Sequence, residues 1–179
     1  MKLVILDRDG VINYDSDAFI KSPDEWIPIP GSMEAIARLS RANWRVVIAS
    51  NQSGIARGLL TMEALNAIHM KLRREVAQAG GIVDAIFVCP HGPDEGCLCR
   101  KPKPGLFQDI ARRYDIDLHA VPAVGDSLRD LQAALLAGCA PWLVLTGNGQ
   151  KTRDMGELPA GTRIADDLAS MVDAWLSEE

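Results

Sequence analysis

The chain has 179 residues, of which 47% are hydrophobic and 24% are charged, a composition typical of one folded domain. Its 24 acidic residues against 19 basic ones give a net charge of −5, which disfavours a broad nucleic-acid-binding surface. No apolar run reaches the roughly 18 residues of a membrane span. The start also lacks the pattern of a secretory leader, so we expect a cytoplasmic protein.

Short apolar runs alternate with segments of helical spacing along the chain. In order, we expect a strand over residues 2–6, a helix over 32–42, a strand over 45–50, a helix over 62–79, a strand over 84–89, a helix over 104–114, a strand over 121–125, a helix over 128–137, a strand over 142–145 and a helix over 166–176. This alternation predicts an α/β fold with a doubly wound, mainly parallel, Rossmann-like sheet, forming one domain over residues 1–179. Two connections, 11–31 and 89–103, are longer than packing requires, and such loops are usually functional.

Polar side chains follow several of these strands. Asp7 and Asp9 come after the first strand, Ser50–Gly54 ends the second, and Asp126 ends the fourth. An isolated Asp-x-Asp-Gly is most often a charged turn. In a parallel sheet, however, all these groups meet at the carboxyl edge, where ligands bind. Carboxylates beside hydroxyl, amide and backbone N–H groups that bind phosphate predict a Mg²⁺ site next to a phosphate.

A basic turn precedes the helix over 104–114 and contains Arg100, Lys101 and Lys103. Clustered lysines are usually solvated surface groups. At this point of a βα chain, we expect at least one of these cations to reach the phosphate. The residues alone leave Lys101 and Lys103 as competing candidates.

The cysteines form a spaced pattern in the second long connection. Cys89, His91, Cys97 and Cys99 lie within eleven residues, and three sulfurs with one imidazole suit tetrahedral Zn²⁺ in a structural site. The alternatives are a disulfide or reduced cysteines packed in a loop. Without an export signal, we favour zinc. We expect the fourth cysteine, Cys139, to be a small buried residue, and we assign no role to His69 or His119.

These motifs resemble those of the haloacid dehalogenase (HAD) superfamily of phosphotransferases, in the same order over residues 7–130. Asp7 and Asp9 resemble its first motif, where Val11 stands in place of the usual Thr; Ser50 resembles the second, a basic residue the third and Asp126 the fourth. The runs DRDGVIN, SNQSGIARG and CRKPKPG, with the zinc loop over 89–99, resemble the heptose bisphosphate phosphatase family within that superfamily. Histidinol-phosphate phosphatases share a similar core and zinc loop, but residues 51–58 fit the heptose family better.

The resemblance implies a role for each motif. Asp7 would be the nucleophile that forms an aspartyl-phosphate, and Asp9 the general acid and then the general base. Mg²⁺ would be held by three groups: the Asp7 carboxylate, the Asp9 backbone carbonyl and the Asp126 carboxylate. Ser50 and Lys101 would stabilise the transferring phosphoryl group, and the family pattern selects Lys101 over Lys103. The residues that the resemblance assigns to substrate binding are Asp15, Ala18, Asn51, Gln52, Ser53, Arg100 and Ser127, the last being often a lysine in relatives.

The implied activity is Mg²⁺-dependent removal of the 7-phosphate from D-glycero-D-manno-heptose 1,7-bisphosphate, in lipopolysaccharide core or nucleotide-activated heptose biosynthesis, with the anomer left open. The alternatives are a histidinol-phosphate phosphatase, a catalytically inactive zinc-loop binding module and a polynucleotide end phosphatase. We expect that the protein has no large cap domain. We also expect it to be a monomer and to bind a small sugar bisphosphate. We expect no nucleic-acid or membrane partner.

Overall fold

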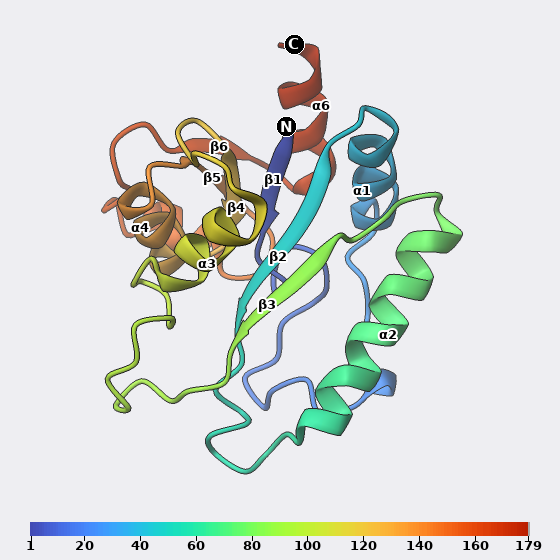
Figure 1. Cartoon of the computed structure of the whole chain (residues 1–179), viewed down its shortest axis with the longest axis vertical. Coiled ribbons are helices and arrows are strands. Elements are labelled where there is room, and N and C mark those ends of the chain that lie inside the picture. The colour runs from blue at the N-terminus through green and yellow to red at the C-terminus, as the bar shows by residue number, and fades with distance from the viewer. Residues whose placement is uncertain (179) are drawn as a thin grey trace.

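The computed structural model describes residues 1–178, which form one sheet covered by helices on both faces (Figure 1). The predicted domain extends to Glu179, which lies outside the described residues. The strands run parallel in the order β3-β2-β1-β4-β5-β6. They are β1 (Leu3–Leu6), β2 (Arg45–Asn51), β3 (Ala85–Cys89), β4 (Pro122–Gly125), β5 (Ala140–Val144) and β6 (Arg163–Ala165). The helices are η1 (Pro23–Glu25), α1 (Ser32–Arg41), α2 (Met62–Gln78), α3 (Gly105–Tyr114), α4 (Leu128–Leu136), α5 (Gly149–Asp154) and α6 (Leu168–Ser177).

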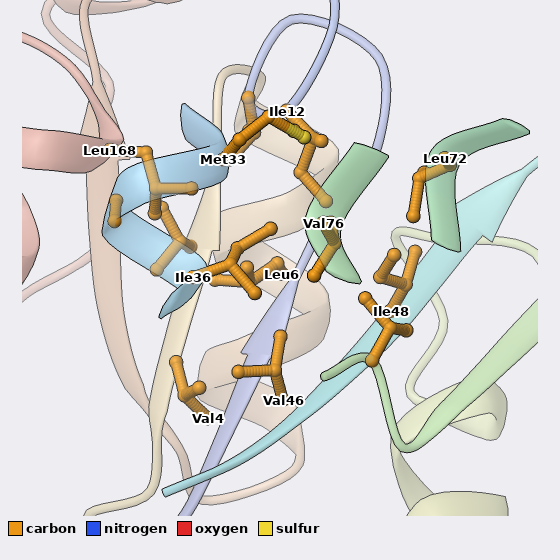
Figure 2. Close-up of a cluster of buried hydrophobic side chains, with 14 of the residues drawn as sticks. Val4, Leu6, Ile12, Met33, Ile36, Val46, Ile48, Leu72, Val76 and Leu168 are labelled. Atoms are coloured by element: carbon orange, nitrogen blue, oxygen red, sulfur yellow. The ribbon is translucent and has the colours of Figure 1, made fainter. Parts of the chain in front are cut away.

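The sheet is buried on both faces, which explains why its central strands read as continuous apolar runs. Side chains alternate along β1, so Val4 and Leu6 enter one core while Leu3 and Ile5 enter the other. Helices α1, α2 and α6 cover the first face, and α3 and α4 cover the second. Figure 2 shows the first core, where strand and helix side chains interdigitate, among them Val4, Leu6, Val46, Ile48, Ile36, Leu72 and Val76.

Helix α2 forms as its apolar stripe predicts. Its buried residues are Leu65, Ile68, Leu72 and Val76, spaced by three or four positions so that they share one face. The side chain of Thr61 accepts a hydrogen bond from the backbone N–H of Ala64 at 3.1 Å, which caps the start of the helix. This helix packs its apolar side on the sheet and turns its polar side outward.

Three short elements were not predicted. Strand β6 is only three residues long, and none of them is buried. Helix α5, with the sequence GQKTRD, lacks the apolar periodicity that predicts a helix. The connection over 11–31 contains η1 and two isolated β-bridges, which join Asn13 to Asp9 and to Pro28. In the described part of the chain, no helix combines the length and the apolar character that a membrane crossing requires.

The strand order reverses between β1 and β4, which lie side by side in the middle of the sheet. The backbone N–H of Asp7, just past β1, donates to the carbonyl oxygen of Val124 in β4 at 2.9 Å. In a doubly wound sheet the crevice outside this reversal is the place where ligands bind. The fold therefore brings the residues that follow β1 and β4 to one site.

Candidate active site

Three buried or nearly buried carboxylates meet at this crevice. Asp7 follows β1, Asp126 follows β4 and Asp130 lies in the first turn of α4, and one oxygen of each lies within 4.8 Å of the others. Burial, with further contributions from the neighbouring carboxylates, raises the pKa of Asp7 to about 8, although Lys101 opposes the shift. Burial and the charge of Asp130 raise the pKa of Asp126 to about 7. Carboxylates crowded in this way are stabilised in their charged form by a divalent cation.

Lys101 is the cation at the centre of the site. Its Nζ lies 2.9 Å from Asp7 Oδ1 and 2.7 Å from Asp130 Oδ1, and it donates a hydrogen bond to the Ala49 carbonyl oxygen at 2.8 Å. Burial lowers the pKa of Lys101, but the two carboxylates raise it by more, so the ammonium group keeps its charge. Lys103 points elsewhere and donates to the Cys97 carbonyl oxygen at 2.7 Å. The geometry thus supports Lys101 over Lys103.

Asp126 is held in place by the loop that follows β5 and by the next helix, α5. The backbone N–H of Asn148 donates to Asp126 Oδ2 at 2.8 Å, and the Asn148 side-chain amide donates to the same oxygen at 3.2 Å. The Thr152 hydroxyl donates to the Asp126 carbonyl oxygen at 2.9 Å. A Cβ atom on Gly10 or Gly147 would collide with this carboxylate, and both glycines have positive φ, 82° and 56°. Glycine is therefore required where these two loops close around Asp126.

The Asp9 carboxylate is surrounded by N–H donors. Arg8 donates to it from Nε at 3.0 Å and from Nη2 at 2.9 Å, Asn13 Nδ2 at 2.9 Å and Gln52 Nε2 at 2.8 Å. Burial raises the pKa of Asp9, but the charge of Arg8 and these hydrogen bonds lower it by more, and the net shift is downward. These donors fix the orientation of the Asp9 carboxylate at the edge of the cavity described below.

The loop after β2 organises the site through its amides. The Ser50 hydroxyl accepts a hydrogen bond from Gln52 Nε2 at 2.9 Å. Asn51 clamps the backbone of Lys101: its Nδ2 donates to the Lys101 carbonyl oxygen and its Oδ1 accepts from the Lys101 N–H, both at 3.1 Å. Ser53 is buried and lines the cavity. The Asn51 and Gln52 side chains thus hold catalytic groups in position as well as facing the cavity.

A cavity of about 260 Å³ opens above these groups. It is lined by the aspartates Asp7, Asp9, Asp126 and Asp130, by Lys101 and by the loop residues Asn51, Gln52 and Ser53, while Ser50 does not line it. Three arginines also line the cavity, namely Arg57, Arg100 and Arg129. The Arg57 guanidinium lies 5.6 Å from the centre of the Phe19 ring, which joins the loop after β2 to the connection over 11–31. The site therefore combines a buried cation at its floor with guanidinium groups around it.

The predicted substrate-binding residues differ in their positions. Asp15 and Arg100 line the cavity, whereas Ala18 lines a neighbouring hollow formed by the same loop. Ser127 does not line the cavity: its N–H and hydroxyl both donate to Asp130 Oδ2, at 3.0 and 2.5 Å, and cap α4.

Sequence reasoning assigned no role to Asp130 or to the lining residues Arg57 and Arg129. The spacing Ser127-x-x-Asp130 is that of a capping box, and this signal points to a helix start directly after the metal-site aspartate. A carboxylate at that helix start lies at the same sheet edge as Asp7, so the capping box was a signal for Asp130. No comparable signal marks the two arginines.

The Cys/His pattern also folds into a compact cluster. The Cys89 Sγ lies 3.6 Å from His91 Nδ1, 3.7 Å from Cys97 Sγ and 3.1 Å from Cys99 Sγ, and His91 Nδ1 lies 3.3 Å from Cys99 Sγ. Four ligands at zinc-binding distance around a tetrahedral ion lie about 3.8 Å apart or slightly less. None of the four cysteines forms a disulfide in this structure, and Cys139 is buried as expected. The Cys/His cluster is consistent with a zinc site.

A capless parallel sheet with Asp7, Asp9, Lys101 and Asp126 at its carboxyl edge defines a hydrolase of the HAD type. Family models agree: one described as HAD-hydrolase-like matches residues 98–171, and one described as polynucleotide kinase 3 phosphatase matches residues 2–130.

Full-length relatives narrow the class. The chain is 68% identical over 178 residues to D-glycero-beta-D-manno-heptose-1,7-bisphosphate 7-phosphatase of Bordetella bronchiseptica, covering 99% of each chain. It is 59% identical to the enzyme of the same name from Pseudomonas putida, covering 96% of this chain and 97% of the relative.

Solved structures agree with these relatives. The D,D-heptose 1,7-bisphosphate phosphatase of B. bronchiseptica, complexed with magnesium and phosphate, superposes with a TM-score of 0.99 at 68% identity and covers 100% of both chains. The corresponding enzyme from Burkholderia thailandensis has a TM-score of 0.79 at 50% identity and covers 99% of both. The chain belongs to the heptose-1,7-bisphosphate 7-phosphatase family of the HAD superfamily, within the broader group that the polynucleotide kinase 3 phosphatase model describes.

Proposed function

We propose that this protein removes the 7-phosphate of D-glycero-D-manno-heptose 1,7-bisphosphate. The observation that carries the proposal is the cavity itself, in which Lys101 lies beside Asp7 at the floor while Arg57, Arg100 and Arg129 line the walls. A substrate with two phosphates matches this distribution, because guanidinium groups bind phosphate through paired hydrogen bonds. The near-identity in fold and length to heptose bisphosphate phosphatases supports the same conclusion.

Asp7 and Asp126 are the residues that fit a Mg²⁺ ion, together with the backbone carbonyl of Asp9 that the family pattern assigns. The fit rests on the chemistry of the donors: the clustered oxygens of Asp7, Asp126 and Asp130 are hard ligands. Burial, together with the charge of neighbouring carboxylates, raises the pKa values of Asp7 and Asp126, and a counter-ion would offset both effects. When bound, the ion supplies charge neutralisation for the transferring phosphoryl group.

The chain's own residues carry the covalent steps. An Asp7 carboxylate oxygen attacks phosphorus, the bond from phosphorus to the sugar oxygen breaks, and an aspartyl-phosphate forms. Asp9 acts in the first step in its protonated form, which the negative charge of the bound phosphate favours: it gives its proton to the departing oxygen. It then takes a proton from the water that hydrolyses the aspartyl-phosphate, so that it ends in the form in which it began. Ser50 and Lys101 donate hydrogen bonds to the phosphoryl oxygens, and the fixed positive charge of Lys101 stabilises the negative charge there.

We assign Zn²⁺ to the cluster of Cys89, His91, Cys97 and Cys99 and give it a structural role. Arg100 follows directly after Cys99 and lines the cavity, with its Nη1 donating to the His91 carbonyl oxygen at 3.4 Å. The zinc loop therefore aims Arg100 at the substrate, in the recognition role that the family pattern gives it.

The proposed substrate is the β anomer, which is the one that the names of the relatives from B. bronchiseptica and P. putida specify. The test is kcat/KM with Mg²⁺ present for the β and α anomers of the bisphosphate, histidinol phosphate and a 3′-phosphorylated oligonucleotide. We expect the β anomer to be preferred and D7N to abolish turnover. Preference for histidinol phosphate, or salt-sensitive turnover of the oligonucleotide, would replace this function by one of the alternatives. The monomeric state and the cytoplasmic location stay predictions, and light scattering on the purified protein tests the first.

A further inference from the structure

A buried arginine, Arg8, lies between Asp7 and Asp9 in the sequence. The side chain of Arg8 is 0% exposed, and all three of its guanidinium nitrogens have partners. Nε and Nη2 form a fork on the Asp9 carboxylate, at 3.0 and 2.9 Å from Oδ1, and Nη2 also reaches Oδ2 at 3.1 Å. The remaining nitrogen, Nη1, lies 3.1 Å from His69 Nε2 on α2. A buried charge is costly unless it is paired and hydrogen-bonded, and each guanidinium nitrogen of Arg8 has a partner.

The chemistry of this contact fixes the state of His69. A guanidinium group has donors and no acceptor, so the Nε2 atom must be the acceptor and the imidazole must carry its proton on Nδ1. The imidazole is therefore neutral. Burial and the charge of Arg8 both act in this direction and hold the pKa of His69 at about 4.

These contacts, made by all three nitrogens, restrict the rotation of the Arg8 guanidinium plane. A planar group that binds one carboxylate with two nitrogens can still tilt, but a third anchor on a different element removes that freedom. Helix α2 supplies the anchor and is itself packed on the sheet through Leu65, Ile68 and Leu72. The orientation of the Asp9 carboxylate thus depends on a helix outside the catalytic loops.

We propose that Arg8 and His69 are positioning residues for Asp9, with His69 acting through the Arg8 guanidinium. The inference rests on the proposed function, because it matters only if Asp9 is the acid and base of the reaction. Asp9 then has to meet the sugar oxygen and the attacking water with the same carboxylate, and general acid–base catalysis depends on that geometry. Neither positioning residue lines the cavity, so neither has a direct role in binding substrate.

The decisive variants are at His69. H69L removes the hydrogen-bond acceptor for Arg8, so the Asp9 carboxylate is no longer held in its catalytic orientation. We expect kcat to fall about tenfold, while KM stays within about twofold because the substrate-binding groups are unchanged. H69Q restores an acceptor at a similar reach and should recover most of kcat. H119L, at an exposed histidine remote from the site, is the matched control and should behave as the unchanged enzyme. R8K, which keeps the charge and loses the fork, tests the same geometry from Arg8 and should lower kcat at least as much as H69L.

A double mutant shows whether His69 works through Asp9. If it does, adding H69L to D9N causes no further loss of kcat. Losses that multiply, a normal kcat in H69L, or an H69Q variant as impaired as H69L would overturn the inference. A D9N variant with full kcat would instead remove Asp9 from the mechanism, so failure of the proposed function is distinguished from failure of the positioning role.

Discussion

The ion pair between Asp130 and Lys101 makes a quantitative prediction for D130N. The aspartate uses both oxygens: Oδ1 lies 2.7 Å from Lys101 Nζ, and Oδ2 accepts from Ser127 at the start of α4. Asparagine has one carbonyl oxygen, so its NH₂ group must face either the ammonium or the Ser127 donors. Removing one partner of a buried ion pair costs about 3–5 kcal/mol of the free energy of unfolding.

Two features of the site reduce that cost. Lys101 keeps Asp7 as a partner at 2.9 Å. The loss of the Asp130 charge also relieves repulsion that raises the pKa values of Asp7 and Asp126. We therefore expect D130N to lower the free energy of unfolding by about 2–3 kcal/mol, or Tm by about 4–12 °C for a domain of this size.

The assay is urea and thermal unfolding at pH 7, followed by circular dichroism. D109N is the control, because Asp109 makes an exposed ion pair with Arg112 on the surface of α3. Its loss should cost less than about 1 kcal/mol. If D130N and D109N unfold at the same urea concentration, Asp130 does not share the buried charge of Lys101 in solution, and the reasoning about this ion pair is wrong.

Three further predictions concern the zinc loop, the cavity wall and His69. C97S should lower the zinc content and raise KM for the sugar bisphosphate several-fold; normal zinc by elemental analysis with normal kinetics would remove the scaffold role. R57A should raise KM about tenfold for the bisphosphate and little for heptose 7-phosphate, because a guanidinium can bind only a phosphate that is present; equal effects on both substrates would place Arg57 elsewhere. Because the folded-state pKa of His69 is about 4 and its unfolded value about 6.5, the unfolded chain binds the proton more readily. Stability from this group is complete above pH 6.5 and is lost as pH falls toward 4, by up to about 3 kcal/mol, and H69Q should flatten that part of the curve.

The central strands and the edge that carries the site were predictable from sequence for one physical reason. Strands buried on both faces must be apolar throughout, and parallel strands place their carboxyl ends together. Asp7, Asp9 and Asp126 could therefore be brought to one site without coordinates. Strand β6 (Arg163–Ala165) could not be predicted, because a short, partly exposed edge strand carries no apolar pattern.

The contacts that complete the site depend on side-chain packing and leave no periodic signal. Nothing in the sequence distinguishes an arginine that points to solvent from one that folds back onto a neighbouring aspartate, as Arg8 does onto Asp9. The pairing of Lys101 with Asp130 likewise depends on how α3 and α4 approach the sheet. The sequence indicated no partner for His69, because Arg8 lies 61 residues away along the chain and the two side chains meet only through folding.

The zinc loop and the phosphate site share the segment from Cys89 to Lys101, and the two ends of this segment are held by different contacts. The Cys89 end is tied to the sheet, because its carbonyl oxygen accepts from the Gln52 N–H at 2.8 Å, and the Lys101 end is clamped by Asn51. Between these ends the loop has little apolar packing, and Leu98 is 78% exposed. A metal ion would supply the cohesion that a core supplies elsewhere. Because Lys101 has its own clamp and Arg100 has only the loop, loss of zinc should disturb substrate recognition by Arg100 before it disturbs the chemistry at Asp7.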